Sequence, residues 1–379
     1  MMLRERSLRG LFMGLVLASA GFCGSAAANP TMLFDLTTGQ VIEHQEAFRR
    51  WYPASLTKLM TAYVTFRAVQ AGELALDSPI TMTKHAAAEP PSKMGFKAGS
   101  VMTLDNALKM MLIKSANDIA MAVGENVGGT EELFVQRMNA EALRLGMTGS
   151  HFVNPNGLPA PDQFTTARDL ALLVSAIRNE FPQYAPYFAI QGLKAGKKVL
   201  MSYNVLVGRY DGADGMKTGF VCSSGFNMIG AATRDGKTLV AVVLGEASAT
   251  KRADTAAGLL DRGFAASGGQ TETVYTLPAY GLVNGAPADM RAEICEKKPA
   301  EGQSEAAAED PAQATKSQWL EKIPNPRLVK VGLGGATGPV PKGWQEHNGD
   351  QEVADVPIPT PRPDYPGDKA AAQGDTASN

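Results

Sequence analysis

The sequence predicts an α/β protein of the α+β kind, in which an antiparallel sheet built from both ends of one domain is packed with helices. Two strand hairpins support this prediction. The first spans residues 32–42 around the turn Thr37-Thr38-Gly39, and the second spans residues 226–244 around Arg234-Asp235-Gly236-Lys237. Because helical patterns fill the sequence between them, we expect strands from both ends to meet in one sheet, followed by a largely low-complexity tail.

Four segments between the hairpins show helical signals. Pro53 stands near the start of the first, Thr103 is placed to cap the second, and Thr166 opens the fourth. The third is marked by three apolar residues, Phe134, Met138 and Leu143, and is expected to end near Gly146.

The first 28 residues have the pattern of an export signal. Three arginines precede an apolar run at residues 11–22, and small residues follow up to Ala28. A short membrane anchor is the alternative interpretation, but the run is short for a bilayer. Cys23 suggests lipidation, and the bulky Phe22 before it argues against that. We therefore predict a signal peptide over residues 1–28 and a protein of the periplasm or cell envelope.

The main domain is expected over residues 29–265 and a Pro/Ala/Gly-rich tail over residues 266–379. Such composition buries too little apolar surface to offset the entropy of ordering. Alternation in the tail predicts a small β module near residues 318–335. The C-terminus has no long amphipathic helix, so we expect no clear membrane anchor after signal cleavage.

Charge and cysteine content limit the partners. A net charge of -2 gives no electrostatic case for nucleic acid. The four histidines, at positions 44, 85, 151 and 347, form no zinc-site or triad spacing and are expected at the surface. We therefore expect no metal and no cofactor. Cys222 and Cys295 remain after signal cleavage, and either form a disulfide or stay as two buried thiols.

The segment Ser55-Leu56-Thr57-Lys58 is the first of three motifs that carry chemistry. Ser55 and Lys58 are three residues apart at a helix start, so their side chains share a face. A serine hydroxyl is a weak nucleophile, and a neutral lysine amine beside it can take its proton. A similar segment, Ser248 to Lys251, follows the last motif and shows no helical start, so we set it aside.

The second and third motifs complete a cleft. In Ser115-Ala116-Asn117, the hydroxyl can pass a proton to a leaving amine and the amide can hold a substrate amide; an ordinary helix cap is the alternative. In Lys217-Thr218-Gly219, at the start of a strand, the first two side chains can bind a carboxylate, and Gly219 lets substrate approach. The backbone N–H groups of Ser55 and Phe220 are expected to hold the oxyanion. A surface turn is the alternative for this last motif.

With these residues, the chain resembles the serine-type D-Ala-D-Ala carboxypeptidases, the low-molecular-mass penicillin-binding proteins of the β-lactamase/transpeptidase-like superfamily. The resemblance covers residues 29–264 and also includes Tyr52-Pro53-Ala54, Phe152 to Leu158 and Gly215 to Gly219. It implies removal of the terminal D-alanine from peptidoglycan stem pentapeptides through an acyl-serine, and slow acylation by β-lactam antibiotics.

Carried over by position, the resemblance gives each motif residue a role. It makes Ser55 the nucleophile and Lys58 its base. It places Ser115 and Asn117 beside the leaving group, and Lys217 and Thr218 on the terminal carboxylate. The sequence departs from the pattern of that family at Phe220 and Cys222, which follow Gly219 on the predicted strand.

Three other functions stay open at this point. One is D,D-endopeptidase activity on cross-links, and another is a non-catalytic peptidoglycan-binding module. The third is a class A-like β-lactamase, which uses a glutamate before the last motif to activate water. Residues 142–179 contain no glutamate, although Asp162 and Asp169 remain.

Overall fold

The computed structural model describes residues 29–266, 271–296, 317, 319–321 and 325–346. The predicted signal peptide, Cys23, His347 and most of the low-complexity tail lie outside the described residues.

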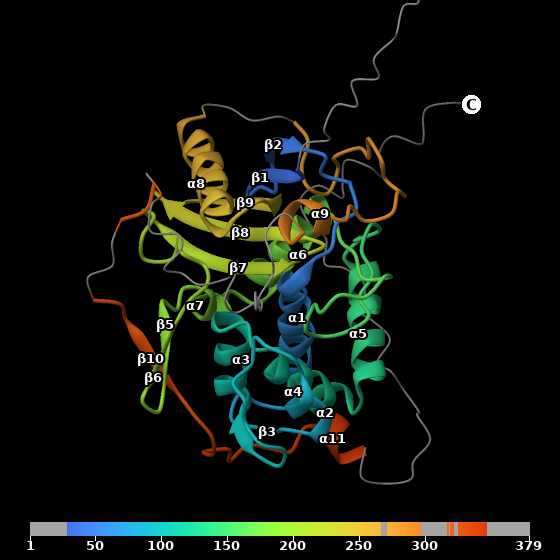
Figure 1. Ribbon diagram of the computed structural model, residues 1–379, viewed down its shortest axis with the longest axis vertical. Coiled ribbons are helices and arrows are strands. Elements are labelled where there is room, and N and C mark those ends of the chain that lie inside the picture. Colours follow the sequence, from blue (N-terminus) through green and yellow to red (C-terminus); the bar gives the residue numbers. More distant parts are fainter. Residues whose placement is uncertain (1–28, 267–270, 297–316, 318, 322–324, 347–379) are drawn as a thin grey trace, which may run out of the picture.

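A five-stranded antiparallel sheet forms the upper part of the molecule (Figure 1). Its strand order is β2-β1-β9-β8-β7. The strands are β1 (Thr31–Asp35), β2 (Val41–Gln45), β7 (Ala213–Val221), β8 (Gly225–Arg234) and β9 (Lys237–Glu246). The first two come from the start of the domain and the last three from its end, so the predicted fold class and the sheet built from both ends are confirmed.

The turn between β8 and β9 explains why the second hairpin was readable in the sequence. Asp235 and Gly236 both have positive φ, at 49° and 79°. This combination belongs to the two-residue turn whose twist matches that of antiparallel strands. Aspartate and glycine tolerate it better than most residues.

The two faces of the sheet enter different apolar clusters because side chains alternate along a strand. In β9, Leu239, Ala241 and Val243 belong to the cluster formed with α8 (Ala249–Ala265). The intervening Val240, Val242 and Leu244 belong to the larger cluster shared with the remaining helices. The sheet is therefore buried on both faces.

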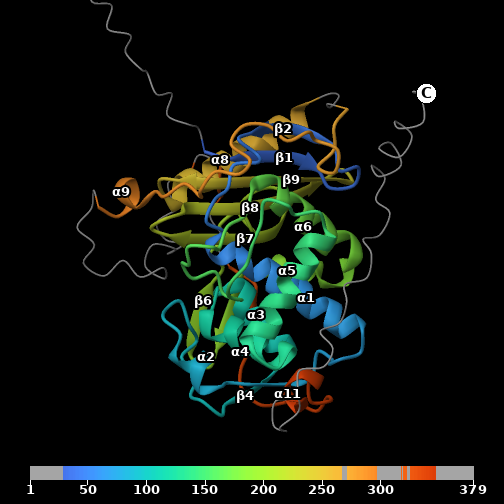
Figure 2. The same ribbon diagram turned by 90° about the vertical axis from the view of Figure 1, so that its right-hand side faces the viewer.

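A helical region packs against one face of the sheet and extends beyond its β7 edge, as Figures 1 and 2 both show. Its helices and short helical turns are η1 (Ala54–Leu56), α1 (Thr57–Gln70), α2 (Lys84–Ala88), α3 (Leu104–Ile113), α4 (Asn117–Gly128), α5 (Glu131–Arg144), α6 (Ala167–Glu180), η2 (Pro182–Tyr184) and α7 (Ala185–Phe188). Thr103 and Thr166 cap α3 and α6 through their side chains, as predicted.

The helix predicted from Phe134, Met138 and Leu143 is present as α5, and of these three residues Leu143 alone points away from the core. Its side chain is 77% exposed, whereas Phe134 and Met138 on the same helix are fully buried. At about 100° of rotation per residue, a position nine residues after Phe134 lies on the opposite side of the helix. Spacing of i, i+4 and i+9 therefore does not describe one face.

Two small sheets were not predicted. β3 (Pro79–Thr81) pairs with β4 (Val101–Thr103), and β5 (Gly192–Ala195) pairs with β6 (Lys198–Met201). The strand expected in the tail is present as β10 (Leu328–Val331). It does not form a module of its own, because it pairs in parallel with β5 and so extends a sheet of the main domain.

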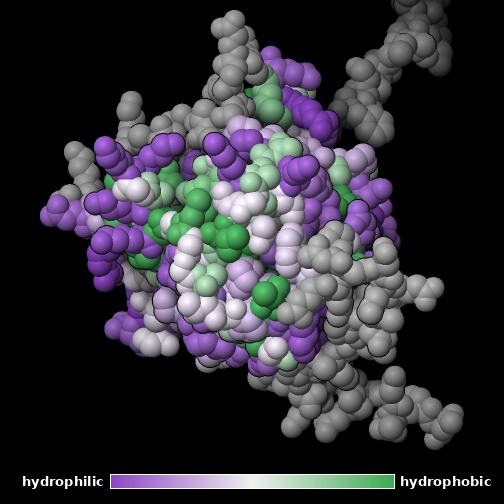
Figure 3. All heavy atoms as spheres, turned by 90° about the horizontal axis from the view of Figure 1, so that it is seen from below, coloured by the Kyte–Doolittle hydropathy of each residue, from purple (hydrophilic) through white to green (hydrophobic). Residues whose placement is uncertain are grey.

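The last described element is α11 (Lys342–Glu346), which lies against the helical region (Figure 1). A Cβ on Gly343 would lie 2.7 Å from the backbone nitrogen of Gly129, so the two backbones pack directly. Seen from below, this end shows apolar side chains gathered between hydrophilic ones (Figure 3). Exposed large apolar residues on β6 and in the C-terminal segment include Val199, Leu333 and Val340. Within the described part of the chain, no helix has the length and apolar character needed to cross a membrane.

Candidate active site

Ser55 lies in η1, immediately before α1, and its hydroxyl meets the amine of Lys58. The distance from Lys58 Nζ to Ser55 Oγ is 2.8 Å. Both residues are buried, Lys58 completely and Ser55 with 2% exposed. The preceding Ala54 has a φ of 48°, a left-handed conformation that alanine adopts at a cost. The backbone is thus bent at the residue that delivers the serine.

Lys58 is held from two other sides as well. Its Nζ donates to Asn117 Oδ1 at 2.8 Å and to the carbonyl oxygen of Asn156 at 2.5 Å. The segment containing Asn156 lies against Ala54, because a Cβ on Gly157 would come within 1.9 Å of the Ala54 carbonyl oxygen. Only glycine fits there, so this loop is locked onto the turn that carries Ser55.

The second motif connects α3 to α4 and faces the third. Lys217 Nζ donates to Ser115 Oγ at 2.9 Å and to the carbonyl oxygen of Thr218 at 2.8 Å. Ser115 has a φ of 61°, which marks a second strained position in the site. The helix-cap alternative for this motif does not hold, since the N-cap of α4 is Ala116 and makes no side-chain cap bond.

The third motif lies in the middle of β7, not at the start of a strand as predicted. β7 begins at Ala213, and four residues precede Lys217 within it. It is the last strand in the sheet order, so its outer edge faces η1 and the helical region (Figure 2). All three motifs therefore converge between the β7 edge and the helices. Phe220 follows Gly219 on this strand, and its ring packs against that of Phe226, with 4.3 Å between the two ring centroids.

Gly219 is required for a reason that the sequence did not reveal. A Cβ at this position would lie 2.8 Å from the backbone nitrogen of Ser55 and 3.1 Å from that of Leu56. The sequence suggested close approach by substrate, and the structure adds close approach by the nucleophile turn itself. The glycine thus sets the gap between the Ser55 backbone and β7.

Sequence reasoning missed two residues beside this site. Asn156 was quoted in the resemblance without a role, yet its carbonyl oxygen accepts a hydrogen bond from Lys58. No pattern in the sequence indicated that Glu89 lies beside the site. It is 8% exposed, and burial raises the pKa of its carboxyl, an effect partly offset by His85, by the Asn156 amide and by Lys58. A buried carboxylate therefore lies within electrostatic reach of the lysine.

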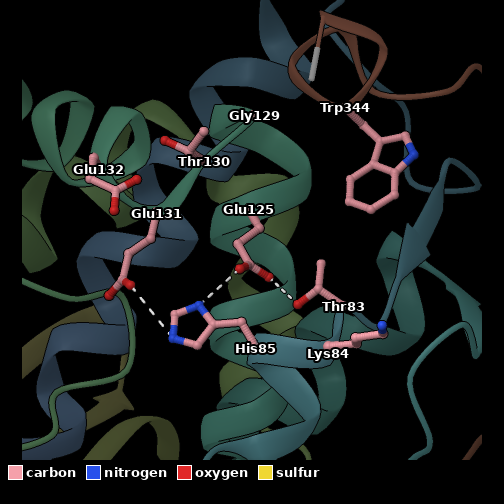
Figure 4. A pocket seen from close by; sticks show the side chains of 9 residues that line it. All are labelled: Thr83, Lys84, His85, Glu125, Gly129, Thr130, Glu131, Glu132 and Trp344. Atoms are coloured by element: carbon pink, nitrogen blue, oxygen red, sulfur yellow. Dashed lines mark hydrogen bonds and ion pairs between the residues drawn. The ribbon is translucent and has the colours of Figure 1, made fainter. Parts of the chain in front are cut away.

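Glu89 also lies 3.9 Å from His85, a residue that lines a hollow of about 480 Å³ shown in Figure 4. His85 lies in this hollow between carboxylates, with Nδ1 3.0 Å from Glu125 and Nε2 3.9 Å from Glu89 and 4.0 Å from Glu131. Burial opposes the charged imidazolium, but Glu125 and the other carboxylates outweigh it and raise the pKa of His85. This histidine is exposed, as expected, and it also has carboxylate partners that the sequence did not indicate. No group of side chains in the described residues is arranged to hold a metal ion.

The two aspartates left open by the lactamase alternative are engaged elsewhere. Asp169 accepts from the backbone of Gly149 and from the hydroxyl of Ser150, at the start of α6. Asp162 is exposed. Neither is seen to contact a motif residue in the described part of the chain.

The expectation that Ser248 to Lys251 shows no helical start is wrong, although this segment lies outside the site. Ser248 does begin a helix, because it caps α8 by accepting from the backbone nitrogen of Lys251. Lys251 itself is exposed. Its helix covers the opposite side of the sheet from the helical region, which separates it from the cleft (Figure 1).

The two cysteines form a disulfide. Cys222 follows the end of β7, and Cys295 directly follows α9 (Arg291–Ile294). The bond joins residues 73 positions apart and fixes α9 beside the strand that carries the third motif.

Comparison with known proteins agrees with this arrangement. A family model described as D-alanyl-D-alanine carboxypeptidase matches residues 18–248. The chain belongs to this carboxypeptidase family. The resemblance predicted from the motifs is therefore confirmed.

Curated members of the carboxypeptidase family are similar over the same region. DacC from Escherichia coli is 34% identical over 253 residues, which cover 63% of this chain and 62% of that protein. DacF from Bacillus subtilis is 30% identical over 254 residues, covering 65% and 64%. The chain thus spans somewhat less than two thirds of the length of these relatives.

Solved structures of carboxypeptidases and penicillin-binding proteins share the fold. DacD from Francisella tularensis aligns with a TM-score of 0.61 and 28% identity over 69% of this chain and 74% of that one. Penicillin-binding protein 6B from E. coli gives 0.60 and 32% over 63% and 77%. Penicillin-binding protein D2 from Listeria monocytogenes, in an ampicillin-bound form, gives 0.58 and 30% over 63% and 98%.

Proposed function

We propose that this protein is a serine-type D-Ala-D-Ala carboxypeptidase that removes the terminal D-alanine from peptidoglycan stem pentapeptides. One observation carries the proposal: the Ser55–Lys58 pair and the Ser115–Lys217 pair lie between the β7 edge and the helices, and the hydrogen bond from Lys58 to Asn117 joins the first motif to the second. The first pair supplies a nucleophile with a base. The second supplies a hydroxyl and a cation on the side where a leaving group with a free carboxylate would lie.

Acylation follows from these positions. The neutral amine of Lys58 takes the proton of Ser55 Oγ as that oxygen attacks the carbonyl carbon between the two D-alanines. The developing oxyanion is held by the backbone N–H groups of Ser55 and Phe220. The Ser115 hydroxyl relays to the leaving amine the proton that Lys58 took from Ser55, so Lys58 becomes a neutral amine again and Ser115 remains a hydroxyl. Lys217 and Thr218 bind the terminal carboxylate. D-Alanine leaves, and the remaining peptide stays on Ser55 as an ester.

Deacylation uses Lys58 as the base a second time. Lys58, again as the neutral amine, takes a proton from a water molecule that attacks the ester. The Ser55 oxygen departs and regains a proton, which releases the shortened peptide. No step in this sequence needs a metal or an organic cofactor, and no role for nucleic acid follows from it.

A β-lactam amide would enter by the same route. Its ring carbonyl accepts the Ser55 oxygen, but the broken amide stays tethered to the acyl group and does not diffuse away. A long-lived adduct is the expected result. Relatives in ampicillin- and cefotaxime-bound forms support this part of the proposal. With the export signal expected in residues 1–28, the protein would act in the periplasm or cell envelope.

The test is the intact mass of the protein incubated with penicillin G and followed over hours. We expect a stable adduct that maps to Ser55 and is absent in Ser55→Ala. Ser248→Ala is the matched control, since it removes the serine of the chance motif and should keep the adduct. An adduct that clears within seconds, with the drug consumed, would instead support a β-lactamase. No adduct at all would support a peptidoglycan-binding module.

Turnover assays distinguish carboxypeptidase activity from D,D-endopeptidase activity. Release of D-alanine from a soluble pentapeptide is the expected activity. Cleavage of cross-linked dimers alone, with no release from pentapeptides, would favour the D,D-endopeptidase.

A further inference from the structure

A second hollow, of about 250 Å³, opens beside the proposed oxyanion position. Its walls come from three segments: Pro90-Pro91, Leu158-Pro159 and Phe220 to Ser223. Arg291 of α9 completes the lining. We call this the Arg291 hollow.

Each of the three walls lies close in space or in sequence to a residue of the active site. The carbonyl oxygen of Pro90 accepts from the Asn117 side chain at 3.1 Å. Leu158 lies two residues after Asn156, which binds Lys58. Phe220 belongs to β7. The Arg291 hollow therefore lies next to the active-site residues.

The direction of a bound peptide follows from the proposed function, on which this inference rests. The terminal carboxylate would lie at Lys217 and Thr218, and the scissile carbonyl nearer Phe220. The substrate would then run antiparallel to the free edge of β7, as an added strand. Each residue advances about 3.3 Å along a strand, so the third residue of the stem peptide would lie opposite Val221 and Cys222. Its side chain would have access to the Arg291 hollow.

The polar groups of the Arg291 hollow suit one chemistry. Ser223 is 1% exposed, and within the described residues its hydroxyl has no hydrogen-bond partner. A buried hydroxyl without a partner costs free energy, so a ligand oxygen there would be favoured. Arg291 adds a guanidinium, which binds carboxylates through paired N–H donors. The rest of the lining is largely apolar and suits a hydrocarbon stem.

The present partner of Arg291 does not block this role. Its guanidinium meets Asp289 at 2.7 Å, with the two side chains 53% and 43% exposed. Exposed ion pairs of this kind contribute little free energy, so exchange for a ligand carboxylate is easy. The disulfide keeps Arg291 in place. The backbone N–H of Cys295 donates to the carbonyl oxygen of Arg291 at 2.9 Å. The sulfur of Cys295 is bonded to that of Cys222, in the wall of the hollow.

We propose that Arg291, with Ser223, recognises a carboxylate at the end of an aliphatic side chain in the third residue of the stem peptide. This commits the substrate to a diamino diacid at that position, in preference to lysine. Lysine has a similar aliphatic stem and terminal amine and lacks the side-chain carboxylate, so the two peptides isolate the group in question.

The experiment compares two synthetic pentapeptides that differ only in carrying 2,6-diaminopimelate or L-lysine at the third position. For the unaltered protein we expect kcat/KM to be about 10- to 100-fold higher for the diacid, the range of one or two charge-assisted hydrogen bonds. Arg291→Gln should lose that preference through a higher KM, with kcat and the lysine peptide nearly unchanged. Ser223→Ala should lose part of it. Arg262→Gln, an exposed arginine paired with Glu43, is the matched control and should keep it.

The role of the disulfide in positioning Arg291 is tested separately with the double variant Cys222→Ala/Cys295→Ala. If the disulfide holds Arg291 in place, this variant should lose the preference as Arg291→Gln does. Equal kcat/KM values for the two peptides with the unaltered protein, or equal losses for both in Arg291→Gln, would overturn the proposal.

Penicillin acylation of Ser55 distinguishes this failure from failure of the proposed function. If acylation and turnover persist without the preference, only the role of Arg291 is wrong. If neither peptide is cleaved and no adduct forms, the carboxypeptidase itself is wrong.

Discussion

The backbone of Gly219 lies so close to the backbone of Ser55 that a single methyl group does not fit between them. A Cβ on Gly219 would lie 2.8 Å from the Ser55 nitrogen, and real Cβ atoms essentially never come that near. The two residues belong to the two sides of the cleft, since Ser55 precedes α1 and Gly219 lies on β7. The width of the cleft at the nucleophile is therefore set by the absence of a side chain at residue 219.

Gly219→Ala should slow acylation strongly while the protein still folds. The added methyl would push β7 away from Ser55, and shifts of about 1 Å in a catalytic geometry cost on the order of 100-fold. The measurement is the second-order rate constant for penicillin acylation, with circular dichroism to verify folding. Gly258→Ala is the control. It lies in α8, where a Cβ would meet only Arg262 at 3.6 Å, and it should leave the rate unchanged. Equal rates for both variants would contradict the argument.

How much of this could be predicted from the sequence depends on the range of each interaction. The hairpin around Asp235-Gly236 and the caps Thr103 and Thr166 rest on contacts a few residues apart, so local patterns revealed them. The motif residues were found because their spacing follows fixed chemical needs. Their roles remain predictions.

The features that escaped prediction depend on contacts between distant segments. Glu89 and Asn156 come near Lys58 only when α2 and the loop before α6 fold around α1. β10 pairs with β5 across more than 130 residues, and neither short strand has a pattern of its own strong enough to predict this.

Lys217→Ala should discriminate between substrates with and without a free carboxylate. Lys217 is buried, with its Nζ on Ser115 and beside the position where the carboxylate would lie. Loss of a charge-assisted hydrogen bond predicts a decrease in kcat/KM of about 10- to 100-fold for a free-acid peptide. The C-terminal methyl ester should lose much less. Lys251→Ala, on the exposed surface of α8, serves as control. Equal losses for acid and ester would show that Lys217 acts on Ser115 alone.

The disulfide should stabilise the main domain, because it restricts the unfolded chain. Closing a loop of 73 residues is worth about 4 kcal/mol in the chain-entropy description. We therefore expect Cys222→Ala/Cys295→Ala to lower the free energy of unfolding by roughly 2–4 kcal/mol in urea titrations. Penicillin acylation of the folded variant should persist, since neither cysteine contacts the Ser55–Lys58 pair. A change below about 0.5 kcal/mol would mean that α9 detaches before the domain unfolds.

His85 should contribute stability that depends on pH. Its pKa is raised in the folded state by Glu125, Glu131 and Glu89, against the opposing effect of burial. A raised histidine pKa means that the folded protein holds the proton more tightly than the unfolded chain. The resulting stability is fully present below the ordinary pKa of about 6.5 and is lost as the pH rises through the higher folded value.

His85→Gln should therefore lower the melting temperature more at pH 5.5 than at pH 8.5. The side chain is 54% exposed, so solvent screens part of the interaction and the difference should be a few degrees at most. His151→Gln is the matched control. That histidine is also exposed, and its Nδ1 meets the backbone carbonyl of Asp162 and not a carboxylate. Its substitution measures the effect of removing an exposed histidine that has no carboxylate partner. A deficit of His85→Gln that grew with pH would have the wrong sign, and it would mean that the carboxylates around His85 do not hold its proton.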